Sequence, residues 1–405
     1  MPFAQVVGHQ GAILALQRAL LAQRVPTAYL FVGPPHIGKT TLAKAFAQAA
    51  NCESPRYPRG ETSDAEALLD ACGECQTCVR IERETYGDTR VLRPRRRVEV
   101  KAEEDPQKQE LQAELDDALL DVRLIERLRM EAAASAVEAR RRVFILTQAE
   151  TMNAEAANRF LKTLEEPPPD LTFILTTAQP SRLLPTLVSR CQISVLHPLH
   201  RADLKAELMR RMTAGPTATA VEKGDTGAWP HLPPERVEQI VSLSGGALGR
   251  ALNLVAKPQI LQLREELLEA LGRLPSMELW EALREGERLL DLTERWWLAE
   301  HPDEAGAEFL KRAHDTAVRA ELRETLGVMQ SWFRDLLALE RVDLLANADR
   351  QAALRTVVAP AYPPHAALAA AEAVEQARAD LRQNPNLRLL TEALMVRLLD
   401  LRRKS

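Results

Sequence analysis

The chain has 405 residues, a length that predicts two or three domains. Its hydrophobic fraction of 46% is sufficient for globular cores, and its abundant Leu, Ala, Glu and Arg favour helices. The net charge of -4 argues against a protein that binds nucleic acid over its whole surface, although a local basic face is compatible with it. No apolar run is long enough to cross a bilayer, and the first residues do not read as a secretory signal. We therefore expect a cytoplasmic protein that does not contact membranes.

A phosphate-binding loop follows the first predicted strand. Residues 28–32 form an apolar run typical of a buried strand. Gly33, Gly38, Lys39 and Thr40 then have the spacing G-x-x-x-x-G-K-[ST], and apolar residues at helical spacing come after them. Strand, glycine-bounded loop and helix in this order predict a site for the phosphates of a nucleotide.

The residue types in this loop suit ATP or ADP. Backbone N–H groups and the positive end of a helix dipole would face the phosphates. Lys39 would reach the β- and γ-phosphates and Thr40 would supply a hydroxyl to Mg²⁺, with Thr41 completing the predicted set. His36 stands where many such loops have glycine, so the pattern predicts the site but not its affinity.

Four of the five cysteines fall in one region. Cys52 follows the predicted helix, and Cys72, Cys75 and Cys78 come at two-residue gaps. Zinc prefers four thiolates in a tetrahedron, and a reducing cytoplasm keeps thiols out of disulfides. An iron–sulfur cluster and unliganded thiols are the alternatives. We predict a structural zinc module over about 52–80, because a closed four-thiolate site leaves no open position for catalysis.

A charged insertion over about 90–118 comes next. Basic residues dominate 90–101, and acidic residues dominate 103–117. Either a solvated hairpin and helix or a phosphate-binding patch would account for this pattern.

Further apolar runs predict three more strands, a buried one at residues 143–146 and two others at 171–177 and 192–196. Helical patterns separate them, one over 120–139 and one around Phe160. Strands that alternate with helices predict an α/β fold, a parallel sheet with helices on both faces.

Several motifs, in order along the chain, resemble those of AAA+ clamp-loader subunits. They are Val-Gly-His-Gln at 7–10, the phosphate loop, the four cysteines, the run Leu-Lys-Thr-Leu-Glu-Glu-Pro-Pro at 161–168, and the triplet Ser-Arg-Cys at 189–191. The likeness spans almost the whole chain and is to the delta-prime and gamma/tau subunits of bacterial DNA polymerase III. It implies a RecA-like AAA+ core, an all-α lid and an all-α collar domain.

The domain boundaries that we expect follow from this likeness. The core would span 1–197, the lid 198–257 with a flexible insertion at about 213–234, and the collar 258–405. Trp332, in a segment that matches the collar, and the adjacent Phe333 are assigned to the core of that domain.

The resemblance also implies roles for two arginines. Arg190 matches the arginine finger that is presented to a neighbouring subunit's nucleotide, where a permanent charge stabilises the transferred phosphoryl group. Arg250, in the run Gly-Gly-Ala-Leu-Gly-Arg-Ala-Leu at 245–252, matches the lid residue that senses the subunit's own nucleotide. Without the family, both would be ordinary surface charges.

The chain departs from hydrolysing family members at the end of its second predicted strand. Those members have an aspartate there that holds Mg²⁺ and a glutamate that polarises water, whereas this chain has Thr147 and Gln148. Neither side chain can ionise or act as a general base at neutral pH, and loss of a positioned base alone costs about 10²–10⁴-fold in rate. Glu150 is the nearest acid, but it lies beyond the strand end and would have to fold back. We predict weakened Mg²⁺ binding and no hydrolysis.

These features favour a delta-prime-like subunit that assembles with delta and gamma/tau and helps to load the sliding clamp on primed DNA during replication. Two alternatives stay open. One is a hydrolysing gamma/tau-like ATPase in which Glu150 supplies the acid. The other is a zinc-stabilised DNA-binding module that has kept an inert nucleotide site.

Overall fold

The structure is a computed structural model, and it describes residues 1–57, 68–94, 120–133, 136–214, 232–300, 310–341, 345–383 and 385–402. Internal contacts divide it into two units: Met1–His200 with Gly246–Gly249, and Arg201–Gly245 with Arg250–Ser405. The segments predicted as lid and collar fall mostly in the second unit, and the boundary between them stays a prediction. Most of the charged insertion and most of the lid insertion lie outside the described residues.

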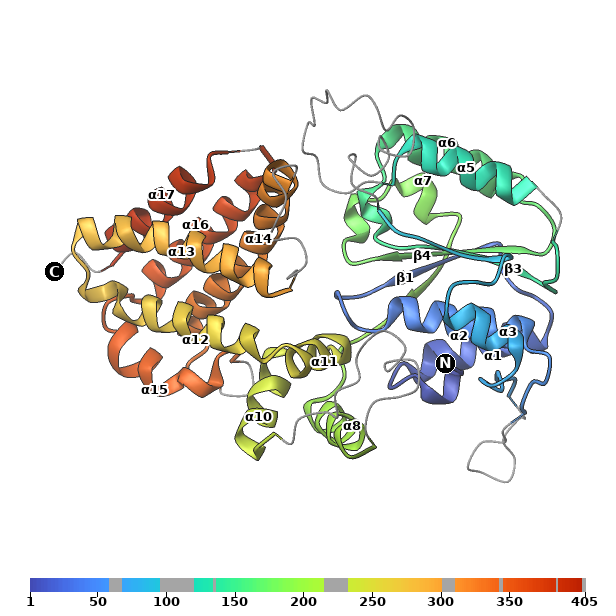
Figure 1. Cartoon of the computed structure of the whole chain (residues 1–405), viewed down its shortest axis with the longest axis horizontal. Coiled ribbons are helices and arrows are strands. Elements are labelled where there is room, and N and C mark those ends of the chain that lie inside the picture. Colours follow the sequence, from blue (N-terminus) through green and yellow to red (C-terminus); the bar gives the residue numbers. More distant parts are fainter. Residues whose placement is uncertain are drawn as a thin grey trace. The chain divides into compact units, whose positions relative to one another are not determined.

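A five-stranded parallel sheet, in the order β2-β3-β4-β1-β5, forms the centre of the first unit (Figure 1). Its strands are β1 (Ala28–Val32), β2 (Thr89–Leu92), β3 (Arg142–Leu146), β4 (Leu171–Thr177) and β5 (Gln192–Val195). The predicted α/β fold with a parallel sheet is confirmed. Sequence reasoning missed β2, because this short edge strand lies at the start of the run of basic residues and does not read as apolar.

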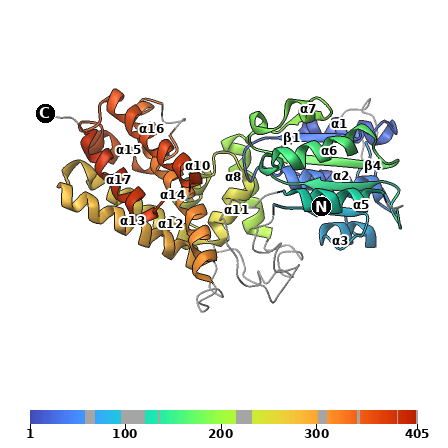
Figure 2. The ribbon, with the colours of Figure 1, turned by 90° about the horizontal axis from the view of Figure 1, so that it is seen from above.

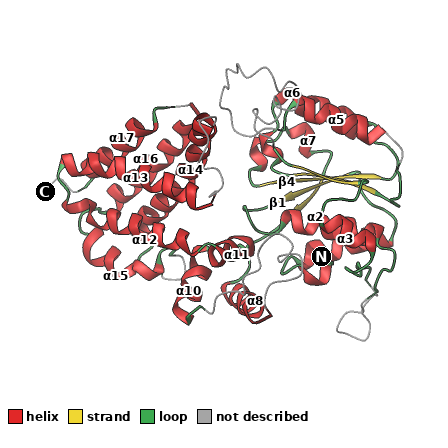
Figure 3. Ribbon diagram, in the orientation of Figure 1, coloured by secondary structure: helices red, strands yellow, loops and turns green. Residues whose placement is uncertain are grey.

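Helices cover both faces of the sheet, as Figures 1 and 3 show. Alternate side chains of a strand point to opposite faces, so Tyr29 and Phe31 belong to one core cluster and Leu30 to another. The first cluster includes residues of α1 (Gln10–Leu21), α2 (Lys39–Asn51) and α3 (Gln76–Glu82). The second includes residues of α5 (Val122–Ala133), α6 (Ala154–Glu165) and α7 (Pro185–Val188).

The start of α6 is set by a local hydrogen bond and its end by proline, whereas the end of α5 is set by hydrogen bonds to a residue distant in the sequence. At the start of α6, the Asn153 side chain accepts the N–H of Ala156 at 2.8 Å, and Pro167 follows its end. The helix predicted to reach residue 139 ends at Ala133 instead. The carboxylate of Asp88 accepts the backbone N–H groups of residues 137, 138 and 139, which takes these donors out of a helix.

All the regular secondary structure among the described residues of the second unit is helical. Its α-helices are α8 (Arg201–Ala214), α10 (Pro234–Leu243), α11 (Leu248–Ala256), α12 (Pro258–Arg273), α13 (Leu279–Glu300), α14 (Leu310–Leu337), α15 (Gln351–Ala353), α16 (Pro364–Asp380) and α17 (Leu387–Asp400). A single apolar cluster joins residues of α12, α13, α14, α16 and α17, which Figures 1 and 2 show packed together. Trp332 and Phe333 lie inside it, as predicted. Among the described residues, no helix has the length and apolar composition needed to span a bilayer.

Candidate nucleotide-binding and thiolate sites

The phosphate loop connects the carboxyl end of β1 to the amino end of α2, and two glycines allow its shape. Gly38 caps α2 with φ 103°, a conformation that residues with a side chain rarely adopt. At Gly33 a Cβ atom would lie 2.6 Å from the backbone oxygen of Leu196, so only glycine fits there. The backbone conformation at Gly38 and the close approach at Gly33 therefore explain why both motif positions are glycine.

Lys39 turns back over the loop. Its Nζ donates to the carbonyl oxygens of Gly33 at 2.6 Å and Pro34 at 2.7 Å. Burial lowers the pKa of Lys39, and the negative charge of Glu150 acts in the opposite direction. Thr40 and Thr41 lie beside Lys39 in the first turn of α2, where backbone N–H groups face any bound anion.

Two histidines belong to the surroundings of the loop. His36 is exposed and has φ 60°, the backbone region that favours glycine, and its carbonyl accepts the Gly249 N–H at 3.0 Å. His9 donates from Nε2 to the Ile37 carbonyl at 3.0 Å. Sequence reasoning did not assign His9 a role in holding the loop, although it lies in the Val-Gly-His-Gln segment near the start.

Thr147 and Gln148 lie directly after β3, where they bring no charge to the site. The backbone N–H and the hydroxyl of Thr147 both donate to the Leu92 carbonyl, at 2.9 and 3.2 Å. Gln148 has φ 51°, and its N–H donates to the Thr176 hydroxyl at 3.4 Å. The hydroxyl of Thr147 is therefore hydrogen-bonded to β2, the edge strand of the sheet.

Glu150 does fold back toward the sheet, which the sequence alone did not establish. The 3₁₀ turn η2 (Ala149–Thr151) reverses the chain after β3, and Glu150 Oε1 accepts the Ala178 N–H at 3.1 Å. Ala178 follows the last residue of β4, and the carbonyl of that residue, Thr177, accepts the Gly33 N–H at 3.1 Å. The carboxylate of Glu150 therefore lies at the carboxyl ends of the parallel strands, where the phosphate loop begins.

Of the two arginines that the family resemblance singles out, Arg190 lies just after α7 with a side chain that is 38% exposed. Its Nη2 donates to Glu165 Oε1 at 2.7 Å and its Nη1 donates to the Thr186 carbonyl at 3.1 Å. Glu165, which sequence reasoning used only as part of a family motif, thus holds this guanidinium. Arg250 is an exposed residue of α11 in the second unit, and its role stays a prediction.

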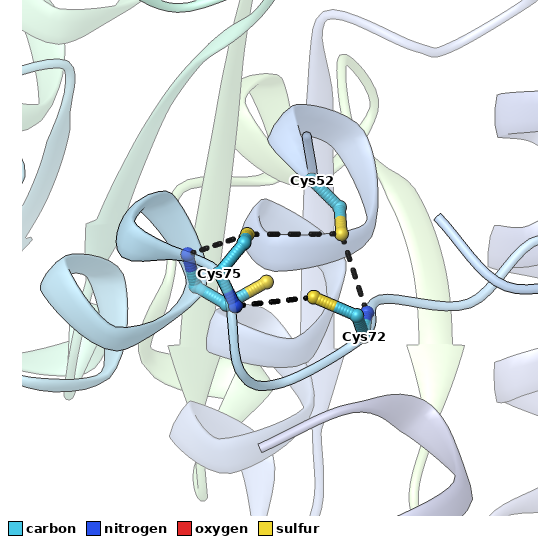
Figure 4. Close-up of side chains that lie close together, drawn as sticks. Cys52, Cys72 and Cys75 are labelled. Atoms are coloured by element: carbon cyan, nitrogen blue, oxygen red, sulfur yellow. Dashed lines mark hydrogen bonds between the residues drawn. The ribbon is translucent and has the colours of Figure 1, made fainter. Parts of the chain in front are cut away.

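The four predicted cysteines converge in the first unit, and Figure 4 shows three of them labelled. The sulfur atoms of Cys52, Cys72, Cys75 and Cys78 all lie within 4.8 Å of one another. Zinc–sulfur bonds of about 2.3 Å in a tetrahedron place sulfur atoms about 3.8 Å apart, and the Cys52 and Cys75 sulfurs are 4.0 Å apart. The donor set and its spacing fit a tetrahedral ion of this kind.

Backbone N–H groups surround the sulfur atoms and favour thiolates. Those of Cys72 and Cys75 donate to the sulfurs of Cys52 and Cys72 respectively, each at 3.2 Å. Burial acts to raise the pKa of Cys72, but the N–H groups of Glu74 and Cys75 outweigh it, so that this pKa falls to about 7. Burial raises the pKa of Cys52 and Cys78, and a cation is what would let these buried thiols ionise.

Comparison with known proteins shows similarity to one family over the N-terminal half of the chain. Residues 8–200 match the family described as DNA polymerase III, delta subunit. The Pseudomonas aeruginosa DNA polymerase III subunit delta' is 33% identical over 54% of this chain and 53% of its own length. The Mycobacterium bovis DNA polymerase III subunit gamma/tau is 34% identical over 51% of this chain and 31% of its own length. The chain thus spans about half the length, or less, of these curated relatives.

Over residues 8–200 the chain is similar to the clamp-loader subunits of bacterial DNA polymerase III, with relatives of both the delta' and the gamma/tau type. A solved Thermotoga maritima DNA polymerase III gamma subunit-related protein overlaps 95% of this chain and 97% of its own at 14% identity, with a TM-score of 0.38.

Proposed function

We propose that this chain is a delta-prime-like clamp-loader subunit that binds a nucleotide without hydrolysing it. The observation that carries the proposal is the end of β3, where Thr147 and Gln148 stand in place of the two acids of hydrolysing relatives. Its partners would be delta and gamma/tau subunits, the sliding clamp and primed DNA within the assembled complex. Mg²⁺ would be held weakly at the site, because neither of these two side chains is charged.

The cysteine cluster, in this proposal, holds one structural zinc ion. Four converging sulfur atoms supply the ligands, and no fifth position is left for a reacting water. The ion would join the end of α2 to the start of α3, since Cys52 caps the former and Cys75 the latter.

Nucleotide binding and turnover by the purified chain test the first half of the proposal. The chain should bind ADP or ATP, lose this binding in Lys39→Ala, and release phosphate no faster than the buffer background. Binding that survives Lys39→Ala would place the nucleotide elsewhere.

Arg190 is proposed to act on a neighbouring subunit's nucleotide. In a complex reconstituted with delta and gamma/tau subunits, Arg190→Ala should slow hydrolysis at the site it serves by a factor on the order of 10³. Arg182→Ala is the matched control, because Arg182 is also an exposed arginine but lies in the 3₁₀ turn before α7. Equal hydrolysis by the Arg190→Ala and control complexes would remove the proposed role.

The position of Glu150 favours a second candidate, a gamma/tau-like ATPase in which this acid supplies the missing base. Steady turnover by the isolated chain that both Lys39→Ala and Glu150→Gln abolish would establish this candidate. It would also exclude the proposed role as a subunit that binds a nucleotide without hydrolysing it.

A further inference from the structure

One carboxylate oxygen beside the phosphate loop is buried without a partner. Glu150 Oε1 accepts the Ala178 N–H, whereas Oε2 is buried and has no hydrogen-bond partner in the part of the chain that the structure describes. A buried acceptor that is left unpaired costs about 1–3 kcal/mol, and more if it is charged. Such an atom at a binding loop points to a ligand that supplies the missing contact.

A continuous set of backbone contacts links this acid to the lysine of the loop. Lys39 Nζ donates to the Gly33 carbonyl at 2.6 Å, and the Gly33 N–H donates to the Thr177 carbonyl at 3.1 Å. The next residue, Ala178, donates its N–H to Glu150. Lys39 and Glu150, which carry opposite charges, therefore both lie at the carboxyl ends of β1 and β4. The negative charge of Glu150 acts to raise the pKa of Lys39.

We propose that Glu150 makes nucleotide binding at this loop depend on a divalent cation. The inference rests on the nucleotide binding proposed above. A nucleotide without metal would bring only negative charge to a lysine whose own charge Glu150 already offsets in part. A hard cation such as Mg²⁺, which prefers oxygen ligands, would give the unpaired carboxylate oxygen an opposite charge. Since positions 147 and 148 carry no charge, Glu150 would supply this preference.

Titration of a fluorescent ADP analogue into the full chain, with and without Mg²⁺, tests the inference. Metal-free buffer should be prepared over a chelating resin, because dissolved EDTA would also compete for an ion at the thiolate site. The wild type should bind the analogue more tightly with Mg²⁺. Glu150→Gln keeps an oxygen to accept the Ala178 N–H but removes the charge. This variant should bind the metal-free analogue about tenfold more tightly than the wild type and show a smaller effect of Mg²⁺.

The control is Glu155→Gln, which removes an exposed acid of α6 that is paired with Arg159. It should leave both dissociation constants as in the wild type. A Glu150→Gln variant as dependent on Mg²⁺ as the wild type would overturn the inference and leave Glu150 as a cap for Ala178. Wild-type binding that is equal in the two buffers would overturn it without any variant.

Failure of the underlying site would look different. If the wild type binds the analogue in neither buffer, or if Lys39→Ala binds as well as the wild type, the proposed nucleotide site falls and the inference falls with it. Binding that Lys39→Ala abolishes, combined with an unchanged response to Mg²⁺ in Glu150→Gln, overturns the inference alone.

Discussion

At the scale of single residues, the phosphate loop depends on backbone conformations that its sequence only partly suits. Gly38 adopts φ 103° at no steric cost, whereas His36 adopts φ 60° with a side chain. His36 is exposed, so its ring does not have to fit inside the loop. The unusual histidine therefore acts on the stability of the loop more than on the space inside it.

His36→Gly should stabilise the first unit. The substitution removes the steric cost of a left-handed residue, so the free energy of unfolding should rise by up to about 1 kcal/mol in urea titrations. Gln23→Gly is a matched control, because Gln23 is exposed with φ 54° at a point outside the loop. It should give a similar gain without altering nucleotide affinity. A less stable His36→Gly variant would show that the ring makes contacts that outweigh the strain.

At the scale of elements, ion pairs and the cysteine cluster connect α2 to the segments that follow it. The carboxylate of Glu84, just after α3, accepts hydrogen bonds from both Nη atoms of Arg93, at 2.6 and 2.7 Å. It also pairs with Lys44 of α2 at 2.7 Å. The cysteine cluster joins the far end of α2 to the start of α3. Both the Lys44–Glu84 pair and the cysteine cluster join α2 to residues that are distant in the sequence.

Glu84→Gln should destabilise the first unit in a pH-dependent way. Hydrogen bonds from Arg93, with help from Lys44, hold the pKa of Glu84 at about 2, below the ordinary 4.5. The ionised form therefore stabilises the fold above pH 4.5, and this contribution is lost as pH falls toward 2. At pH 7 the variant should lose about 1 kcal/mol, since the pair is partly exposed to solvent. The gap should shrink in unfolding titrations at pH 3, whereas Glu74→Gln, at an exposed pair, should show little effect at either pH.

Cys78→Ser should abolish retention of zinc. The sulfur of Cys78 is buried within the cluster, and a hydroxyl is a poor replacement for a thiolate ligand. Metal analysis after dialysis should find about one zinc per wild-type chain and none in the variant. Cys191→Ser is the control, because the Cys191 thiol donates to the Leu187 carbonyl at 3.3 Å and lies outside the cluster. Equal zinc in all three proteins would contradict the site.

At the scale of the whole molecule, the chain consists of two units with separate cores. The second unit contains an ion pair of its own, in which the arginine is buried and the aspartate is partly exposed. Arg264 of α12 is 4% exposed and donates to both carboxylate oxygens of Asp349 at 3.0 Å and to Asn347 at 2.7 Å. Gln239 of α10 donates to the same Asp349 at 3.1 Å, so this pair links the segments predicted as lid and collar.

Arg264→Met should weaken the second unit and leave the first unchanged. Removal of the buried guanidinium leaves the buried Asn347 and the partly exposed Asp349 without this hydrogen-bond donor, which costs about 1–3 kcal/mol. Calorimetry should show two unfolding transitions, of which the variant lowers one and removal of zinc lowers the other. Arg295→Met, at a half-exposed pair with Glu266, should cost less than about 1 kcal/mol. A single transition that both treatments shift equally would mean that the units unfold as one.

The sequence by itself determined what depends on short stretches of chain. The phosphate loop could be predicted because a strand, two glycines and a helix start within a few residues impose their own backbone shape. The four apolar runs predicted their strands because the residue types within a few consecutive positions favour an extended backbone. The cysteine spacing predicted a ligand set, since three of the four thiols lie within one turn and a short helix.

Only the tertiary structure decided the rest, because it depends on contacts between residues that are distant in sequence. The strand β2 exists through its pairing with β3, and α5 ends early because Asp88 takes up the N–H groups beyond it. Glu150 lies at the end of β4, beside the strand that leads into the phosphate loop, because the carboxyl ends of parallel strands meet on one side of the sheet, which no spacing along the chain encodes. The acid that the pattern placed out of reach is therefore beside the loop.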